Sequence, residues 1–151
     1  MVIKNPYHDA KLKLDSAEHV LLNTYSKLKD PKVLLAVAET LHEAMTGLIA
    51  AFLYNEKIAK RISIYPTSTE AQLELFKEVM AANGFDQMIA KNVESLRALM
   101  SARKTSSMEF VRKETVVILN DAFDIKQVTE DKMKKYLDSA QKLAAACTEG
   151  Q

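Results

Sequence analysis

Residues 31–61 read PKVLLAVAETLHEAMTGLIAAFLYNEKIAKR, and this stretch decides the fold class. Asp30 supplies a side-chain acceptor for the first turn, and Pro31 suits the first helical position because its missing N–H would be unpaired there anyway. The predicted helix is apolar on almost all sides. Its one polar strip contains Lys32, Glu39, Glu43, Thr46 and Lys57. A helix that meets water only along a strip is typical of the centre of a helical bundle.

The flanking sequence predicts four further helices. Apolar residues recur at spacings of three and four in residues 6–29, 68–82, 86–103 and 130–147. Capping residues precede three of these ranges: Asn5, Thr67 in a Thr-x-x-Glu capping box, and Thr129. Gly84 follows the second range and supplies the left-handed conformation common past a helix end.

Residues 108–128 fit two alternatives. Helical spacing links Met108, Val111, Thr115, Ile118 and Ala122, whereas the run TVVIL at 115–119 is rich in the β-branched residues typical of strands. Polar residues at 120, 121 and 124 indicate turns. We therefore predict an all-α single domain over residues 1–151. It is a bundle of five or six helices around the long central helix, with either a helix or a short β element near residues 110–126.

Composition excludes several classes of protein. With 48% apolar and 27% charged residues, the 151-residue chain has the profile of one globular domain. Lysine plus arginine (21) nearly balances aspartate plus glutamate (20), so net charge indicates neither a polyanion nor a membrane surface as partner. The single cysteine, Cys147, excludes an internal disulfide, and three glycines are too few for a glycine-rich phosphate loop. The N-terminus lacks the apolar core of a signal peptide, and the most apolar stretch, residues 44–54, is shorter than the roughly 20 residues of a membrane span. We expect a cytoplasmic protein without membrane contact and without a cofactor.

The acid–histidine cluster is Glu39-Thr40-Leu41-His42-Glu43. In a tight hairpin about Asp30, Glu18 would lie level with His42, and the four polar residues would form a metal-site alternative. Carboxylate-bridged di-metal bundles need two Glu-x-x-His pairs, and a zinc protease would need a histidine where Thr46 stands. The main prediction is therefore that no metal is bound. A metal-dependent hydrolase of nucleotides or nucleic acid that uses Glu18, Glu39, His42 and Glu43 is the alternative hypothesis.

A second acidic feature is the ridge formed by Glu70, Glu74 and Glu78 at intervals of four residues. A magnesium site would need a second acidic pair on the facing helix, which offers mainly Glu94. The prediction is a solvated ridge supported by Lys77.

The densest basic segment runs from residue 97 to residue 113. It holds Arg97, Arg103, Lys104, Arg112 and Lys113 against one acid, Glu109, for a local balance of +4. The hydroxyl residues at 105–107 are suited to bonding phosphate oxygens. This segment is the predicted binding surface for an RNA backbone or an acidic partner. The alternative is a solvated connection whose cations offset the negative end of a helix.

Two stretches of the first half suggest a family. They are Leu14-Asp15-Ser16-Ala17-Glu18, and the apolar Ala38-Glu39-Thr40-Leu41-His42-Glu43-Ala44 that follows the Asp-Pro turn. Residues 8–60 resemble the helical hairpin of HEPN-type bundles, which implies a role in RNA cleavage or in partner binding in toxin–antitoxin systems. Active HEPN ribonucleases share an Arg-x(4–6)-His motif. Here no arginine precedes any histidine, so the resemblance implies a non-catalytic, binding member.

We therefore predict a non-enzymatic helical interaction module that binds a protein partner or RNA. A homodimer is a third hypothesis, because the long apolar perimeter of the central helix would need a second chain if one chain did not cover it.

Overall fold

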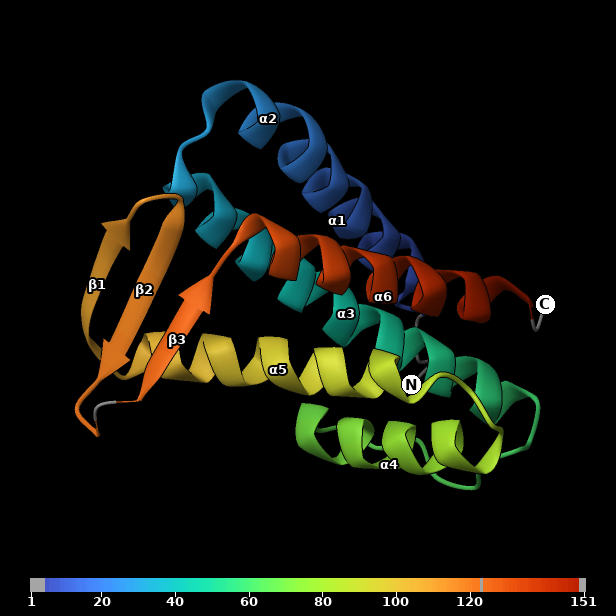
Figure 1. The fold of residues 1–151 in the computed structure, drawn as a ribbon. Coiled ribbons are helices and arrows are strands. Elements are labelled where there is room, and N and C mark those ends of the chain that lie inside the picture. Colours follow the sequence, from blue (N-terminus) through green and yellow to red (C-terminus); the bar gives the residue numbers. More distant parts are fainter. Residues whose placement is uncertain (1–4, 123, 150–151) are drawn as a thin grey trace.

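The computed structural model describes residues 5–122 and 124–149 as a helical bundle with a small sheet at one end (Figure 1). The central helix is α3 (Pro31–Ile58). Around it pack α1 (Tyr7–His19), α4 (Thr69–Ala82), α5 (Gln87–Lys104) and α6 (Glu130–Glu149). The predicted single-domain bundle around a long central helix is confirmed.

The predicted first helix is continuous but changes its winding. α1 leads into a π-helical turn, η1 (Val20–Thr24), and then into α2 (Tyr25–Leu28). Lys29 ends the helix in the left-handed conformation with φ 52°. The Oδ1 atom of Asp30 then accepts a hydrogen bond from the backbone N–H of Lys32 at 3.0 Å, and α3 begins at Pro31. The predicted turn at Asp30 is confirmed.

Most helix ends lie where the capping residues predict them. Gly84 has a φ of 69°, and the hydroxyl of Thr129 accepts a hydrogen bond from the N–H of Lys132 at 3.2 Å. The capping box at Thr67 is wrong by one residue. Ser68 caps α4 by accepting a hydrogen bond from the N–H of Ala71 at 3.1 Å, and Glu70 lies in the first turn of the helix.

Residues 106–128 form a three-stranded antiparallel sheet. Its strands are β1 (Ser106–Arg112), β2 (Thr115–Asn120) and β3 (Ile125–Val128), in the order β1-β2-β3. Of the two alternatives for this stretch, the β element is confirmed and the helix is wrong. Val116, Ile118 and Val128 are buried on the inner side of the sheet, where β2 packs against α3 and α5.

The core follows from the apolar perimeter of α3. Twelve of its apolar side chains are buried against the other helices of the same chain: Leu34, Leu35, Val37, Ala38, Leu41, Ala44, Met45, Leu48, Ile49, Ala51, Phe52 and Leu53. Among the residues described, α3 alone is long and apolar enough to cross a membrane, a criterion that the core helix of a bundle also meets. Because this perimeter is covered within one chain, it gives no support to the homodimer hypothesis.

Gly47 marks a close approach between α1 and α3. A Cβ atom at this position would lie 2.7 Å from the Cβ atom of Ala10, well inside van der Waals contact. We expect Gly47→Ala to lower the free energy of unfolding by about 1–3 kcal/mol because it overpacks the contact, although alanine is the better helix former. Urea denaturation of the two proteins measures this difference.

The matched control for Gly47→Ala is the double variant with Ala10→Gly. Exchanging the two residues moves the methyl group to the other helix and removes the clash, so the double variant should be more stable than Gly47→Ala alone. If the Gly47→Ala variant were as stable as the wild type, the close approach of α1 and α3 at this position would be contradicted.

Candidate functional site

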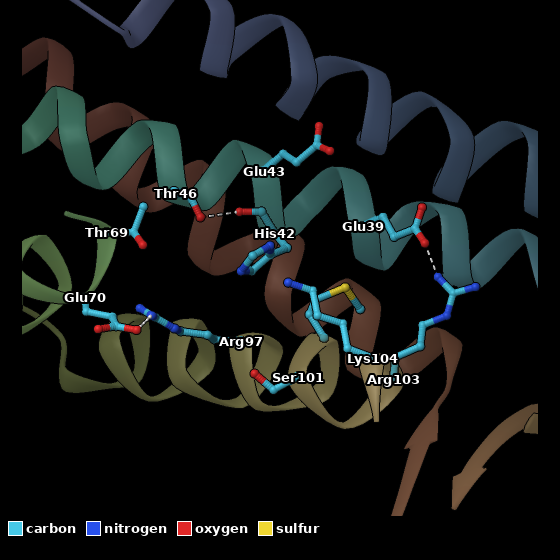
Figure 2. Close-up of a pocket in the computed structure, with 11 residues that line it drawn as sticks. Glu39, His42, Glu43, Thr46, Thr69, Glu70, Arg97, Ser101, Arg103 and Lys104 are labelled. Atoms are coloured by element: carbon cyan, nitrogen blue, oxygen red, sulfur yellow. Dashed lines mark hydrogen bonds and ion pairs between the residues drawn. The ribbon is translucent and has the colours of Figure 1, made fainter. Parts of the chain in front are cut away.

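An open, polar cavity of about 700 Å3 lies between α3 and α5, beside the start of α4 (Figure 2). Its lining residues are Glu39, His42, Glu43 and Thr46 of α3, Thr69 and Glu70 of α4, and Arg97, Met100, Ser101, Arg103 and Lys104 of α5. The fold thus brings together the acid–histidine cluster, one member of the acidic ridge, and three of the five predicted basic residues.

Each carboxylate of this cavity lies beside a cation. Glu39 forms an ion pair with Arg103, whose Nε also donates to Glu109 of β1 at 2.9 Å. This hydrogen bond to Glu109 is the main cause of a raised Arg103 pKa. Glu43 lies 3.2 Å from the Nζ atom of Lys13 on α1.

Glu70 and Arg97 form the loosest of these pairs. The Nη2 atom of Arg97 is 3.6 Å from the Oε1 atom of Glu70, and no hydrogen bond joins the two side chains. The Lys104 side chain forms neither an ion pair nor a hydrogen bond with any described residue. The donors that face the cavity without a close partner are therefore those of Arg97 and Lys104.

His42 points into the cavity between these two cations (Figure 2). Burial lowers the pKa of its imidazole, Arg97 and Lys104 lower the pKa further, and Glu43 offsets part of the effect. Burial and the two neighbouring cations thus favour the neutral form of the imidazole.

The predicted metal ligands do not gather. Within residues 5–122 and 124–149, no three His, Cys, Asp or Glu side chains lie close enough together to hold a metal ion. Ala10 lies against Gly47, and Lys13 pairs with Glu43, so the register places Glu18 about one helical turn from His42, toward the start of α3. The predicted alignment of Glu18 with His42 is wrong.

The acidic ridge and the lone thiol also have structural surroundings. Lys77 pairs with both Glu74, at 3.2 Å, and Glu94 of the facing helix. Cys147 is buried, and the burial raises its pKa to about 12. Its Sγ atom lies 3.4 Å from the carbonyl oxygen of Leu48, as expected of a core residue rather than a nucleophile.

The basic segment divides into two groups. Arg97, Arg103 and Lys104 line the cavity, whereas Arg112 and Lys113 lie at the turn between β1 and β2. At about 3.3 Å per strand residue, the seven residues of β1 separate the two groups by roughly 20 Å. The five basic residues are close together in the sequence, but they do not form one patch on the surface.

A second groove, of about 730 Å3, lies between β1 and the first turns of α3. Its lining residues are Lys32, Leu35, Ala36, Glu39, Arg103, Glu109, Phe110, Val111 and Val116. Glu39 and Arg103 line both hollows, so their ion pair lies on the boundary between the cavity and this groove. No sequence pattern predicts this groove, because it exists only once residues 106–120 form strands.

Ser101 was not among the predicted site residues, although the sequence contains a signal for it. Arg97, Ser101 and Lys104 are spaced by four and three residues, which places them on one face of a helix. In the structure this face of α5 borders the cavity.

Comparisons with family models, curated proteins and solved structures found no match to this chain. The resemblance of residues 8–60 to HEPN-type bundles therefore stays a prediction.

The electrostatics of the cavity predict an unusual titration of His42. We expect its pKa to lie below 6.5 in an NMR titration, and we expect Lys104→Ala to raise it because a neighbouring positive charge is lost. Lys135→Ala is the control, since Lys135 is exposed on α6 and lines neither hollow. A His42 pKa that lies at or above 6.5 and does not change in Lys104→Ala would contradict this description.

Proposed function

We propose that this protein is a non-enzymatic interaction module that binds an extended, acidic segment of a partner protein along β1. One observation supports this proposal most directly: the edge of β1 that faces away from β2 is free. β2 is the only strand that pairs with β1 among the described residues, and all β1 residues after Ser106 are exposed.

A free strand edge presents a row of unpaired backbone donors and acceptors. Such an edge binds an additional strand through main-chain hydrogen bonds, while pockets for alternate side chains provide specificity. Natural proteins protect such edges with short strands, covering elements, charged side chains or bulges, and the register shift of β1 is confined to its beginning, between Ser106 and Met108. β1 has seven residues, which is enough for several main-chain hydrogen bonds.

The groove beside β1 offers an apolar surface for the incoming side chains. Leu35, Ala36, Val111 and Val116 line it, and Val111 is 43% exposed. Alternate residues of an added strand point to the same side of the sheet, so every second side chain of the partner would pack into this groove.

Charge determines the chemistry of the partner. Both acids of the groove, Glu39 and Glu109, pair with Arg103. Lys32 at the groove and Arg112 at the end of β1 pair with no acid among the described residues, and neither does Lys113. An acidic segment therefore suits this surface. A second copy of β1 would bring further cations, and its one acid is held by Arg103.

The same ion pairs favour a protein partner over the RNA of the basic-segment hypothesis. Arg103 pairs with Glu39 and Glu109, and Arg112 and Lys113 lie at the far end of β1 from the cavity, so the five predicted basic residues do not form one surface along an RNA backbone. The hydrolase alternative has no comparable support, because Glu39 and Glu43 are in ion pairs.

The test uses a synthetic probe: a seven-residue peptide of alternating valine and threonine that ends in two aspartates. We expect it to shift the backbone amide NMR signals of β1, and we expect a peptide with a central proline not to, because proline cannot donate to the ladder. Arg112→Glu combined with Lys113→Glu should weaken binding of the aspartate peptide about fivefold or more. The same double variant should bind a peptide that ends in two lysines more tightly than the wild type does.

Lys135→Glu is the control, since it reverses one positive charge outside the groove. Equal binding of the proline peptide, or equal affinity after the Arg112 and Lys113 reversal, would overturn the proposal. Light scattering that returns twice the chain mass would assign the free edge to a second copy instead.

A further inference from the structure

We infer that the cavity around His42 binds the phosphate group of a small phosphate ester. This site is separate from the β1 groove, and the inference does not depend on the partner protein proposed there. It rests on the donors that converge on one face of the cavity and on the way in which its carboxylates are paired.

Three hydrogen-bonding side chains project from one face of α5. Arg97, Ser101 and Lys104 follow each other at spacings of four and three residues, and all three line the cavity. Arg97 is half-buried, which restricts the motion of its side chain. Its guanidinium forms no hydrogen bond to Glu70, so its donors are available to a ligand. Planar guanidinium and compact ammonium donors are the usual binding groups for phosphate oxygens.

The opposite wall supplies His42. Its neutral imidazole carries one N–H donor, and the ring points between Arg97 and Lys104 (Figure 2). Thr46 is not a further donor, because its hydroxyl already donates to the carbonyl oxygen of His42 at 2.8 Å. A phosphate between α3 and α5 would therefore meet donors from both helices.

The three carboxylates and three cations that line the cavity balance, but their pairing leaves one cation available to an anion. Glu39 and Glu43 are held by Arg103 and Lys13, which leaves Lys104 without a counter-charge among the described residues. The one loose pair is Glu70 with Arg97, at 3.6 Å. A phosphate would take the place of Glu70 beside Arg97, so Glu70 is a competitor of the ligand.

The size of the cavity indicates a small ligand. Its volume of about 700 Å3 lies within the usual range of roughly 300–1,000 Å3 for small-molecule sites. Met100 provides an apolar patch on the wall for the organic part of an ester. The phosphodiester of a single RNA strand offers related chemistry, and affinity distinguishes the two sources.

Binding of phosphate should also change the titration of His42. The groups around this ring are Glu43 on its own helix, Arg97 and Lys104 on α5, and Glu70 on α4. An added anion favours the protonated imidazole, so saturating phosphate should raise the pKa of His42. A merely structural role for these residues would not produce this shift.

The experiment is an NMR titration of the full chain with inorganic phosphate, a nucleoside 5′-monophosphate, and a ten-nucleotide RNA without terminal phosphates. We expect the monophosphate to shift the signals of His42 and the last turns of α5. Lys104→Ala should weaken binding about tenfold, and Glu70→Gln should strengthen it severalfold because the competitor loses its charge. Lys135→Ala should leave the affinity unchanged.

The outcomes separate the sources of the phosphate. Monophosphate that binds more tightly than the RNA supports a small ester. RNA that binds more tightly, with an affinity that falls steeply as salt rises, would overturn the small-ester proposal in favour of an RNA backbone. The proposed site would be wrong if the signals that shift belong to residues outside the cavity. It would also be wrong if neither Lys104→Ala nor Glu70→Gln changed the affinity.

Discussion

Because apolar side chains surround α3 on nearly all sides, other elements of the chain have to cover it. Each large aliphatic side chain that becomes fully buried contributes about 1.5–3 kcal/mol, so this covering dominates the stability of the fold. The polar strip of α3 is the part that cannot be covered in this way. Glu39, His42, Glu43 and Thr46 belong to this part of the helix, and the open cavity lies over them. The position of the candidate site is thus a consequence of how the core is built.

Arg103 connects the three elements that surround this strip. It lies on α5 and pairs with Glu39 of α3 and Glu109 of β1. Partly exposed ion pairs contribute little stability, so the main effect of this network is positional. It links the middle of β1 to α3 and lies between two hollows of different character. The cavity on one side is polar, and the groove on the other is lined largely by apolar residues.

Local patterns in the sequence were sufficient to predict the helices, most of their caps and the central place of α3, because these depend on residues within a few positions of one another. The pairing of charges was not predictable in this way. Arg103 is neutralised by Glu39, 64 residues earlier in the chain, and only packing reveals this. The alignment of Glu18 with His42 failed for a related reason. The offset between two antiparallel helices depends on close contacts such as that of Ala10 with Gly47.

Residues 106–128 show why the rest of the site was hidden. The sequence at 115–119 satisfies both helical spacing and strand propensity, so its structure depends on the surface available for burial. As a strand, β2 buries Val116 and Ile118 against α3 and α5 and pairs with a neighbour on each side. β1 has only one neighbour, since the sheet ends there. The same packing that turns this segment into strands therefore leaves both outer strands of the sheet, β1 and β3, with a single neighbour among the described residues, and it places the β1 edge beside an apolar groove.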